Sequence, residues 1–210
     1  MADARVHPTA IVEDGVQLGS DTSVWDAAHL RGPSTIGRGC IIGGKTYVAY
    51  GVRVGDLCKL NAGVYVCTGV TLERGVMIGA GSTFTNDRFP RACNADLTEP
   101  YPSEPDEHTE ATRVCEGATL GARVTIGPGL TIGRFAMIGM ASVVTRDVSD
   151  FHLVVGSPAR PVGVVCRCGP PVWRGDPRTL ERTISVTCET CGRSLTIDAG
   201  GDVHEAEGDR

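Results

Sequence analysis

The chain has 210 residues, of which 41% are apolar and only 5% aromatic, and its formal net charge is −5 at pH 7. An acidic balance without a basic run argues against nucleic acid as the main partner. No apolar run approaches the ~18 residues of a membrane span, and the opening Met-Ala-Asp-Ala-Arg-Val holds no segment of signal-peptide length. We therefore expect a cytoplasmic protein with no membrane partner.

Every sixth residue between positions 6 and 84 is large and apolar, and a second series four residues behind contains nothing larger than Val. A period of six fits neither a helix nor a flat strand, but it fits a chain that turns a corner after each short strand. We predict an all-β fold, a parallel β-helix whose hexapeptides form the three sides of each coil. The large positions are Val6, Val12, Leu18, Val24, Leu30, Ile36, Ile42, Val48, Val54, Leu60, Val66, Leu72, Ile78 and Phe84.

Small residues mark the corners of these coils. Glycine often follows the large residue, which suits a turn that needs an unusual backbone conformation. Such glycines are Gly19, Gly37, Gly43, Gly55 and Gly79. Cys40 and Cys58 belong to the small series and are predicted to be buried thiols, and the total of nine cysteines is odd. A reducing compartment fits this usage better than a disulfide framework.

The repeat stops after Phe84 and resumes from Val114 to Val144. Residues 85–113 are rich in Pro, Asp, Glu and Thr and lack the period, so we expect a loop extruded from one corner. Loops of this length are usually functional or disordered. The predicted β-helix domain spans residues 1–163, including this loop.

Two short cysteine knuckles, each followed by Gly, come after the repeat: Cys166-Arg-Cys168-Gly and Cys188-Glu-Thr-Cys191-Gly. They resemble a zinc ribbon, in which four thiolates on Zn²⁺ replace a core that so short a segment cannot build. We predict a structural zinc site of Cys166, Cys168, Cys188 and Cys191 in a tail of residues 164–199. Two disulfides or four free thiols are the alternatives. Residues 200–210 are polar and expected to be disordered.

The loop opens with Phe84-Thr-Asn-Asp-Arg-Phe-Pro-Arg91. This resembles the Phe-Thr-Asn-x-x-x-Pro-Arg signature of the hexapeptide-repeat sugar-nucleotide N-acetyltransferases, which acylate a 3-amino group on UDP- or dTDP-linked deoxysugars. The resemblance implies left-handed coils, against the usual right-handed crossover rule. It covers nearly the whole chain and includes His7-Pro-Thr-Ala, Val24-Trp25, His29, Lys59, Gly117-Ala-Thr-Leu-Gly-Ala and Gly156-Ser-Pro-Ala-Arg160.

The resemblance places catalysis on Asn86, because the Asn of the signature hydrogen-bonds near the reacting amine. Amine attack on a thioester needs little more than placement, so a general base is helpful but not compulsory. In the alternative interpretation Asn86 only starts a turn. His29 is the candidate base, or else a histidine satisfied by a neighbouring coil. The other histidines show no metal-ligand spacing, which disfavours a γ-carbonic anhydrase.

The resemblance also implies an acceptor pocket for the sugar nucleotide. This chain departs from the family there, with Asn61-Ala-Gly in place of the usual Gln-Asn-Asn and Asp26 where a His is common. We therefore expect a nucleotide-linked amino-deoxysugar or a related small amine as the acceptor. The implied substrate-binding residues are Trp25, Arg31, Lys59, Asn61, Asp87 and Arg91.

On the donor side, the resemblance implies acetyl-CoA or another acyl-CoA in a groove between two subunits of a homotrimer. Small residues of the later coils let the pantetheine reach backbone groups, and two arginines meet the phosphates. Each arginine alone is more often a solvated surface charge. The implied residues are Gly121, Ala122, Gly139, Met140, Ala141, Arg146 and Arg160.

The sequence thus favours an acyl-CoA-dependent N-acyltransferase, with acetyl as the implied acyl group. One alternative is a non-catalytic sugar-binding or assembly protein that keeps the β-helix without the chemistry. A second is an O-acetyltransferase, which needs a base for a hydroxyl, and His29 is its candidate.

Overall fold

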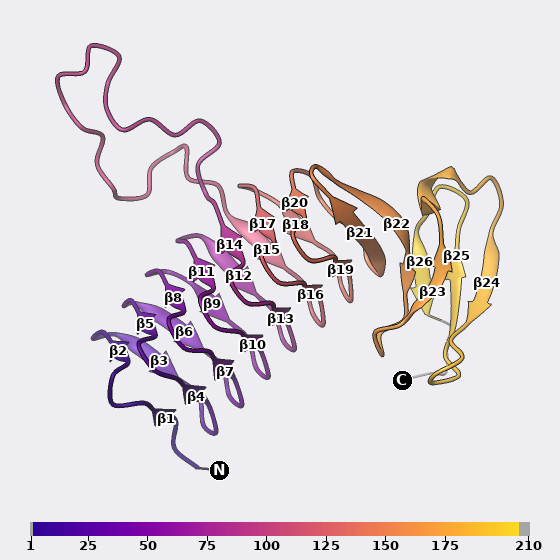
Figure 1. Ribbon diagram of the computed structural model, residues 1–210, viewed down its shortest axis with the longest axis horizontal. Coiled ribbons are helices and arrows are strands. Elements are labelled where there is room, and N and C mark those ends of the chain that lie inside the picture. The colour runs from indigo at the N-terminus through magenta and orange to yellow at the C-terminus, as the bar shows by residue number, and fades with distance from the viewer. Residues whose placement is uncertain (1, 206–210) are drawn as a thin grey trace.

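The computed structural model describes residues 2–205 and shows a stack of triangular coils whose sides form three sheets (Figure 1). Strands within the stack pair in parallel, and partners such as Ser23 and Ile41 lie 18 residues apart, which is three hexapeptides. The predicted all-β hexapeptide β-helix is confirmed.

Sheet 1 has ten strands, sheet 2 seven and sheet 3 six. Sheet 1 contains β1 (Arg5–Val6), β4 (Ser23–Val24), β7 (Ile41–Ile42), β10 (Lys59–Leu60), β13 (Met77–Ile78), β16 (Thr119–Leu120), β19 (Met137–Ile138), β21 (His152–Gly156), β22 (Ala159–Val165) and β23 (Pro171–Arg174). Sheet 2 contains β2 (Ile11–Val12), β5 (His29–Leu30), β8 (Tyr47–Val48), β11 (Tyr65–Val66), β14 (Thr83–Phe84), β17 (Thr125–Ile126) and β20 (Val143–Val144). Sheet 3 contains β3 (Val16–Leu18), β6 (Ser34–Ile36), β9 (Arg53–Val54), β12 (Val70–Leu72), β15 (Thr112–Val114) and β18 (Thr131–Ile132).

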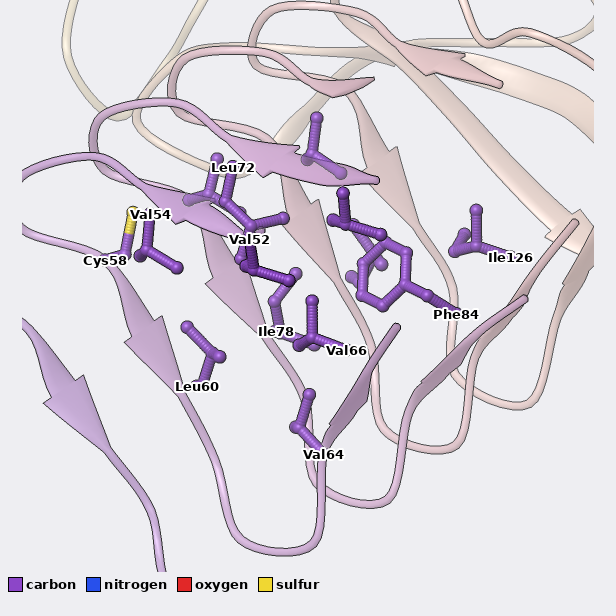
Figure 2. Close-up of a cluster of buried hydrophobic side chains, with 14 of the residues drawn as sticks. Val52, Val54, Cys58, Leu60, Val64, Val66, Leu72, Ile78, Phe84 and Ile126 are labelled. Atoms are coloured by element: carbon purple, nitrogen blue, oxygen red, sulfur yellow. The ribbon is translucent and has the colours of Figure 1, made fainter. Parts of the chain in front are cut away.

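The large residues of the repeat fill the inside of the prism, as Figure 2 shows for Leu60, Ile78 and Phe84. These three side chains are at most 1% exposed. The first coil differs, because Val6 is 40% exposed and Val12 is only half-buried. That coil forms the end of the stack, so its inward residues are covered from one side only.

The glycines after the large residues have a different role from the one expected. None of Gly19, Gly37, Gly43, Gly55 and Gly79 has a positive φ, although many other corner residues do. A Cβ on Gly43 would instead lie 2.6 Å from the backbone nitrogen of Ala62 in the next coil. Glycine is therefore required here because neighbouring coils approach too closely for a side chain.

The small series lies at the corners and caps carbonyls of the next coil. The Thr46 hydroxyl donates to Asn61 O at 3.0 Å, and the Cys58 thiol donates to Glu73 O at 2.9 Å. Cys40 and Cys58 are buried free thiols, as predicted. These two side chains are thus satisfied without leaving the core, whereas the buried Ser34 hydroxyl of the same series has no partner among residues 2–205.

The extruded loop leaves the stack at the corner between sheets 2 and 3 (Figure 1). It covers residues 85–111 rather than 85–113, because β15 begins at Thr112. The coils continue across it without a break, since Phe84 pairs with Ile126. The insertion therefore changes one corner and leaves the core intact.

The tail does not begin at the predicted boundary. Residue 163 lies inside β22, which pairs antiparallel with β21 and β23 and so extends sheet 1. Beyond a short 3₁₀ helix η1 (Pro177–Thr179), a separate sheet forms from β24 (Ile184–Thr187), β25 (Ser194–Ile197) and β26 (Val203–Glu205). The strand β26 contradicts the expected disorder of residues 200–210 for its own span, and residues 206–210 lie outside the described residues.

A second apolar cluster joins the tail to the last coil. Phe151 of the coil packs in one cluster with Val164, Leu195 and Ile197. The His152 ring is 2% exposed, and its Nε2 lies 2.8 Å from Gly201 O. The tail therefore covers part of the end of the β-helix through buried contacts.

Candidate functional site

A cleft of about 750 Å³ opens at the corner between sheets 2 and 3, under the base of the extruded loop. The loop base is closed by a bridge between Asp87 and Thr109, and the Glu110 N–H donates to Asn86 O at 2.8 Å. Four of the predicted site residues line this cleft: Asn86, Arg31, Asp87 and Arg91. The structure therefore brings together the loop signature and part of the predicted acceptor pocket.

Asn86 is the second residue of the loop after β14, behind Thr85. It is half-buried, and its Nδ2 donates to Thr68 O, the carbonyl of the coil below, at 3.3 Å. Among residues 2–205 its Oδ1 accepts no hydrogen bond. The side chain is thus anchored through its amide nitrogen and presents a carbonyl acceptor, which suits the N–H of an incoming amine. The same bond also anchors the turn out of β14, as the structural interpretation of Asn86 expects.

Aromatic side chains form a row on the outer surface of sheet 2 that leads towards this cleft. His29, Tyr47 and Tyr65 occupy the same register in three successive coils. The Tyr47 and Tyr65 rings stack with centroids 5.2 Å apart, and the His29 ring meets Tyr47 edge-on at 5.5 Å. Both tyrosines line the cleft, whereas His29 does not.

His29 is held by a carboxylate that sequence reasoning missed. Its Nε2 lies 2.8 Å from Glu13 Oε1, and Arg31 Nε donates to the same oxygen at 3.2 Å. The hydrogen bond from His29 lowers the pKa of the Glu13 carboxyl, against the opposing effect of burial. His29 therefore has a satisfied partner in a neighbouring coil, as the structural interpretation expects.

Asn86 and His29 do not meet within one subunit. Three coils separate them along the stack, since His29, Tyr47, Tyr65 and Thr83 are successive partners. At roughly 4.8 Å per coil this is about 14 Å. A single amine cannot touch both side chains in one subunit, so the two catalytic predictions are independent of each other.

The remaining acceptor-side residues lie elsewhere. Trp25 and Asn61 follow β4 and β10 at the corner between sheets 1 and 2, and Lys59 lies on the outer surface of sheet 1. None of the three lines the cleft. Trp25 is 48% exposed, with the Arg5 guanidinium 5.9 Å from its ring. In one subunit the predicted acceptor residues thus fall at opposite edges of sheet 2.

The predicted donor residues also divide into two groups. The small residues form adjacent turns at the corner between sheets 1 and 2, where the Ala141 N–H donates to Ala122 O at 2.9 Å and Met140 is 78% exposed. Gly121 and Gly139 belong to the same turns. The two arginines, Arg146 and Arg160, line a separate cleft of about 80 Å³ at the end of the stack.

The sequence did not identify three tyrosines that line the cleft, Tyr47, Tyr50 and Tyr65, nor Glu13 beside His29. The signal was present for two of them, because His29, Tyr47 and Tyr65 are spaced by 18 residues. Once three hexapeptides are taken to close a coil, that spacing places all three side chains in one row. Tyr50 lies 5.4 Å from the Arg31 guanidinium, a contact that no spacing rule identifies.

The tail gathers its four knuckle cysteines. The Sγ atoms of Cys166, Cys168, Cys188 and Cys191 all lie within 4.8 Å of one another. The separations are 3.5 Å for Cys166–Cys191 and 3.6 Å for Cys168–Cys188. Zn–S bonds of about 2.3 Å in a tetrahedron place the sulfurs about 3.8 Å apart. The donor set therefore fits a tetrahedral Zn²⁺, and none of the four is in a disulfide.

Backbone N–H groups surround these sulfurs. The Cys191 and Thr190 N–H groups lower the pKa of the Cys188 thiol, and the Arg193 N–H leads in lowering the pKa of the Cys191 thiol to about 6. A hydrogen bond to Cys191 raises the pKa of the Cys168 thiol to about 12. Thiolates are the form that binds a divalent metal, so the N–H groups that lower the pKa of Cys188 and Cys191 favour metal binding there.

Comparison with known sequences confirms the resemblance to hexapeptide-repeat acyltransferases. The family model of the hexapeptide repeat of succinyl-transferase matches residues 33–67. Over 57 residues the chain is 51% identical to a dTDP-3-amino-3,6-dideoxy-alpha-D-galactopyranose 3-N-acetyltransferase of Aneurinibacillus thermoaerophilus, covering 27% of this chain and 30% of the relative. It is 31% identical over 130 residues to serine acetyltransferase 2 of Arabidopsis thaliana, covering 62% of this chain and 30% of the relative. The chain thus spans about a third of the length of these curated relatives.

Solved structures share the fold. LpxA, a UDP-N-acetylglucosamine acyltransferase from Bacteroides fragilis, matches with a TM-score of 0.61 at 14% identity, over 78% of this chain and 62% of that one. AntD, an N-acyltransferase from Bacillus cereus in complex with dTDP and 3-hydroxybutyryl-CoA, gives 0.54 at 19% identity, over 79% and 81%. These likenesses show a common β-helix. Among residues 2–205, no helix has the length and apolarity needed to cross a membrane.

Proposed function

We propose that this protein transfers an acyl group from acyl-CoA to the amine of a nucleotide-linked amino-deoxysugar. The observation that carries the proposal is the identity of 51% over 57 residues, 27% of this chain, to a dTDP-amino-sugar N-acetyltransferase, on a chain with the hexapeptide repeat. The Phe84-Thr-Asn-Asp-Arg-Phe-Pro-Arg91 segment supports it, because its Asn lines the cleft under the extruded loop.

In the proposed reaction, Asn86 Oδ1 accepts a hydrogen bond from the substrate amine and orients the nitrogen lone pair. The nitrogen attacks the thioester carbonyl, the C–N bond forms and the C–S bond breaks. The departing thiolate takes up the proton that the amine loses, so acid and base balance without a dedicated residue. A reaction without a dedicated base agrees with the structure, because His29 lies three coils away from Asn86 within one subunit.

The cleft suits a nucleotide-linked sugar in its chemistry. Its lining is mixed in charge. Three arginines, Arg31, Arg88 and Arg91, line it together with five carboxylates, Asp87, Glu104, Asp106, Glu107 and Glu110. Arg31 pairs with Glu13 at 3.2 Å and Arg88 with Glu110 at 2.8 Å, which leaves Arg91 as the arginine without an ion pair among residues 2–205. Guanidinium groups bind phosphate oxygens in a forked geometry, and aromatic faces such as Tyr47 offer a stacking surface for a base.

We propose a homotrimer in which the donor groove forms between subunits. Within one subunit, the small donor residues and the loop signature lie at opposite edges of sheet 2, and two subunits packed side by side bring unlike edges together. The outward side chains of the sheets favour sheet 1 over sheet 3 as the surface that packs against another subunit. The outward row of sheet 1 holds four apolar side chains, Ile41, Met77, Met137 and Leu153, together with Arg5, Ser23, Lys59 and Thr119. The outward row of sheet 3 is polar throughout, with Gln17, Thr35, Arg53, Thr71, Arg113 and Thr131.

We propose structural Zn²⁺ in the tail, bound by Cys166, Cys168, Cys188 and Cys191. The 3.5 and 3.6 Å sulfur separations and the backbone N–H groups around Cys188 and Cys191 support this assignment. The metal would join the end of β22 to the β24–β25 hairpin, since the first two cysteines follow β22 and the last two lie in the hairpin turn.

An O-acyltransferase is a second candidate, and one observation favours it. His29 and Glu13 form an imidazole–carboxylate pair at 2.8 Å, the arrangement that a base for a hydroxyl needs. This pair lies outside the cleft, on the first two coils. A non-catalytic sugar-binding protein is the alternative that predicts no thiol release at all.

The test is free-thiol release from acetyl-CoA against UDP- and dTDP-linked 3-amino and 4-amino sugars, with product masses measured in parallel. We expect release together with a gain of one acetyl group on a particular sugar. The same sugars with a hydroxyl in place of the amine are the matched controls. Acetylation of those controls would indicate the O-acyltransferase, and coenzyme A binding without release would contradict transfer to these acceptors.

A further inference from the structure

The two arms of the extruded loop meet directly beside Asn86. The Glu110 N–H donates to Asn86 O at 2.8 Å, and one residue further from the coils Asp87 bridges to Thr109. The side chains close the same gap, because Arg88 Nη2 lies 2.8 Å from Glu110 Oε2. We call these three contacts the loop clasp. They join the first arm of the loop to the second at the point where both leave the coils.

Glu110 is itself held between two coils. It lies two residues before β15, so the second arm of the loop rejoins the stack immediately after it. Its carboxylate covers Gly129 of the next coil, where a Cβ would collide with Glu110 Oε2. Its backbone carbonyl faces the preceding coil, 3.7 Å from the place that a Cβ on Gly69 would occupy. Neighbouring coils therefore fix the position of Glu110 from both sides.

Asn86 has less support from its own side chain. Among residues 2–205 that side chain makes one hydrogen bond, from Nδ2 to Thr68 O, and its length of 3.3 Å is above the usual range. The backbone carbonyl of Asn86 is held by the Glu110 N–H. The direction of Asn86 Oδ1 thus depends on where Glu110 holds the backbone. A displacement of about 1 Å can cost roughly 100-fold in a reaction that relies on placement.

We propose that Glu110 is a positioning residue that holds Asn86 in place for the acceptor amine, and that Arg88 holds the Glu110 carboxylate. This assignment rests on the proposed function, whereas the loop clasp itself does not. A hydrogen bond between two charged groups is stronger than one to a neutral amide, so removing either charge should loosen the base of the loop. Arg88 then serves the loop rather than a phosphate of the substrate.

The experiment measures kcat for Glu110→Gln, alone and combined with Asn86→Ala. In the single variant we expect kcat to fall about two- to fivefold, the range for a partly exposed ion pair, with the KM for acetyl-CoA unchanged. In the Asn86→Ala background the same substitution should have no further effect, because Glu110 acts through Asn86. The matched control is Glu73→Gln, whose carboxylate pairs with Arg113 outside the cleft and which should keep full kcat.

Two results would overturn the positioning role: an unchanged kcat in Glu110→Gln, or an equal loss with and without the Asn86 side chain. Substitutions of Arg88 test the ion pair from its other side. Arg88→Gln should lower kcat as much as Glu110→Gln does, the combined variant should lose no more than either alone, and Arg88→Lys should retain part of the activity. Additive losses in the combined variant would show that the two side chains act separately and would contradict the proposal.

Hydrogen exchange separates the loop clasp from the function. Arg88→Gln leaves Glu110 in place, so exchange of the Glu110 amide can be compared directly with that in the unmodified protein. We expect exchange about two- to fivefold faster in Arg88→Gln and unchanged in Glu73→Gln. If the unmodified protein acetylates no acceptor while this pattern holds, the proposed function fails and the loop clasp stands. Equal exchange in all three proteins would overturn the loop clasp.

Discussion

The coils and the two segments that depart from them are stabilised by different means. In the coils the same surroundings recur every 18 residues, so Leu60 and Ile78 are each at most 1% exposed between equivalent neighbours. The extruded loop lacks such neighbours, and its Phe89 is 85% exposed. The tail relies on a small apolar cluster and four gathered sulfurs. The repeat therefore fixes the positions of side chains in the coils, whereas the candidate catalytic Asn86 and the candidate zinc ligands lie in the two segments that interrupt or follow the repeat.

The largest effect should be the unfolding of the tail alone when the proposed zinc is lost. Removing the proposed zinc with a chelator, or introducing Cys191→Ser, should unfold the tail, because structural zinc contributes roughly 10 kcal/mol or more to such segments. Metal content and limited proteolysis measure the outcome, and the coils should keep their own melting transition. Cys93→Ser in the extruded loop is the control. A tail equally protease-resistant with and without metal would contradict the zinc assignment.

A core substitution should test the coils next. Leu72→Ala in β12 removes a side chain that is 1% exposed, and the free energy of unfolding should fall by about 2–5 kcal/mol. Thr71→Ala in the same strand points outwards and should change it by less than about 0.5 kcal/mol. Denaturant unfolding measures both. Comparable losses would mean that β12 is in the opposite register.

A smaller effect should follow from the close approach of the coils. Gly43→Ala places a Cβ 2.6 Å from the Ala62 nitrogen, so the coils must move apart at a cost of about 1–3 kcal/mol. Gly63→Ala meets open space and costs only the strain of its φ of +69°, about 1 kcal/mol. Thermal unfolding of both variants should rank Gly43→Ala as the more damaging. If Gly63→Ala were the more damaging variant, backbone conformation rather than close approach of the coils would explain the glycine at position 43.

The smallest effect should be the pH dependence of the first coils. The hydrogen bond from His29 lowers the folded-state pKa of Glu13 below 4.5, so its contribution is present above that pH and is lost as the pH falls through the folded value. The difference in melting temperature between the unmodified protein and Glu13→Gln should therefore shrink from pH 5 to about pH 3. It should also weaken in salt. A constant difference would show that the contact is not a charged one.

The sequence predicts the coils better than the segments that leave them. A period of six specifies which side chains point inwards, and the two knuckles specify four cysteines that the structure gathers. It does not reveal that β22 runs across residue 163, because antiparallel pairing in the tail follows no period. Nor does the sequence alone reveal that Asn86 lies far from Trp25 and Lys59 within one subunit. Their distribution over different corners follows only from three-dimensional placement of each hexapeptide.

The central claim is that Asn86 orients the acceptor amine, and the direct measurement is the turnover of Asn86→Ala with the acceptor that the unmodified protein acetylates. We predict a fall of at least about tenfold in kcat, with coenzyme A affinity and oligomeric state unchanged, because one positioning hydrogen bond is lost. Asn94→Ala, a loop asparagine outside the cleft, should keep full turnover. Unchanged turnover in Asn86→Ala with a lower melting temperature would contradict the account and leave Asn86 as a turn residue anchored to Thr68.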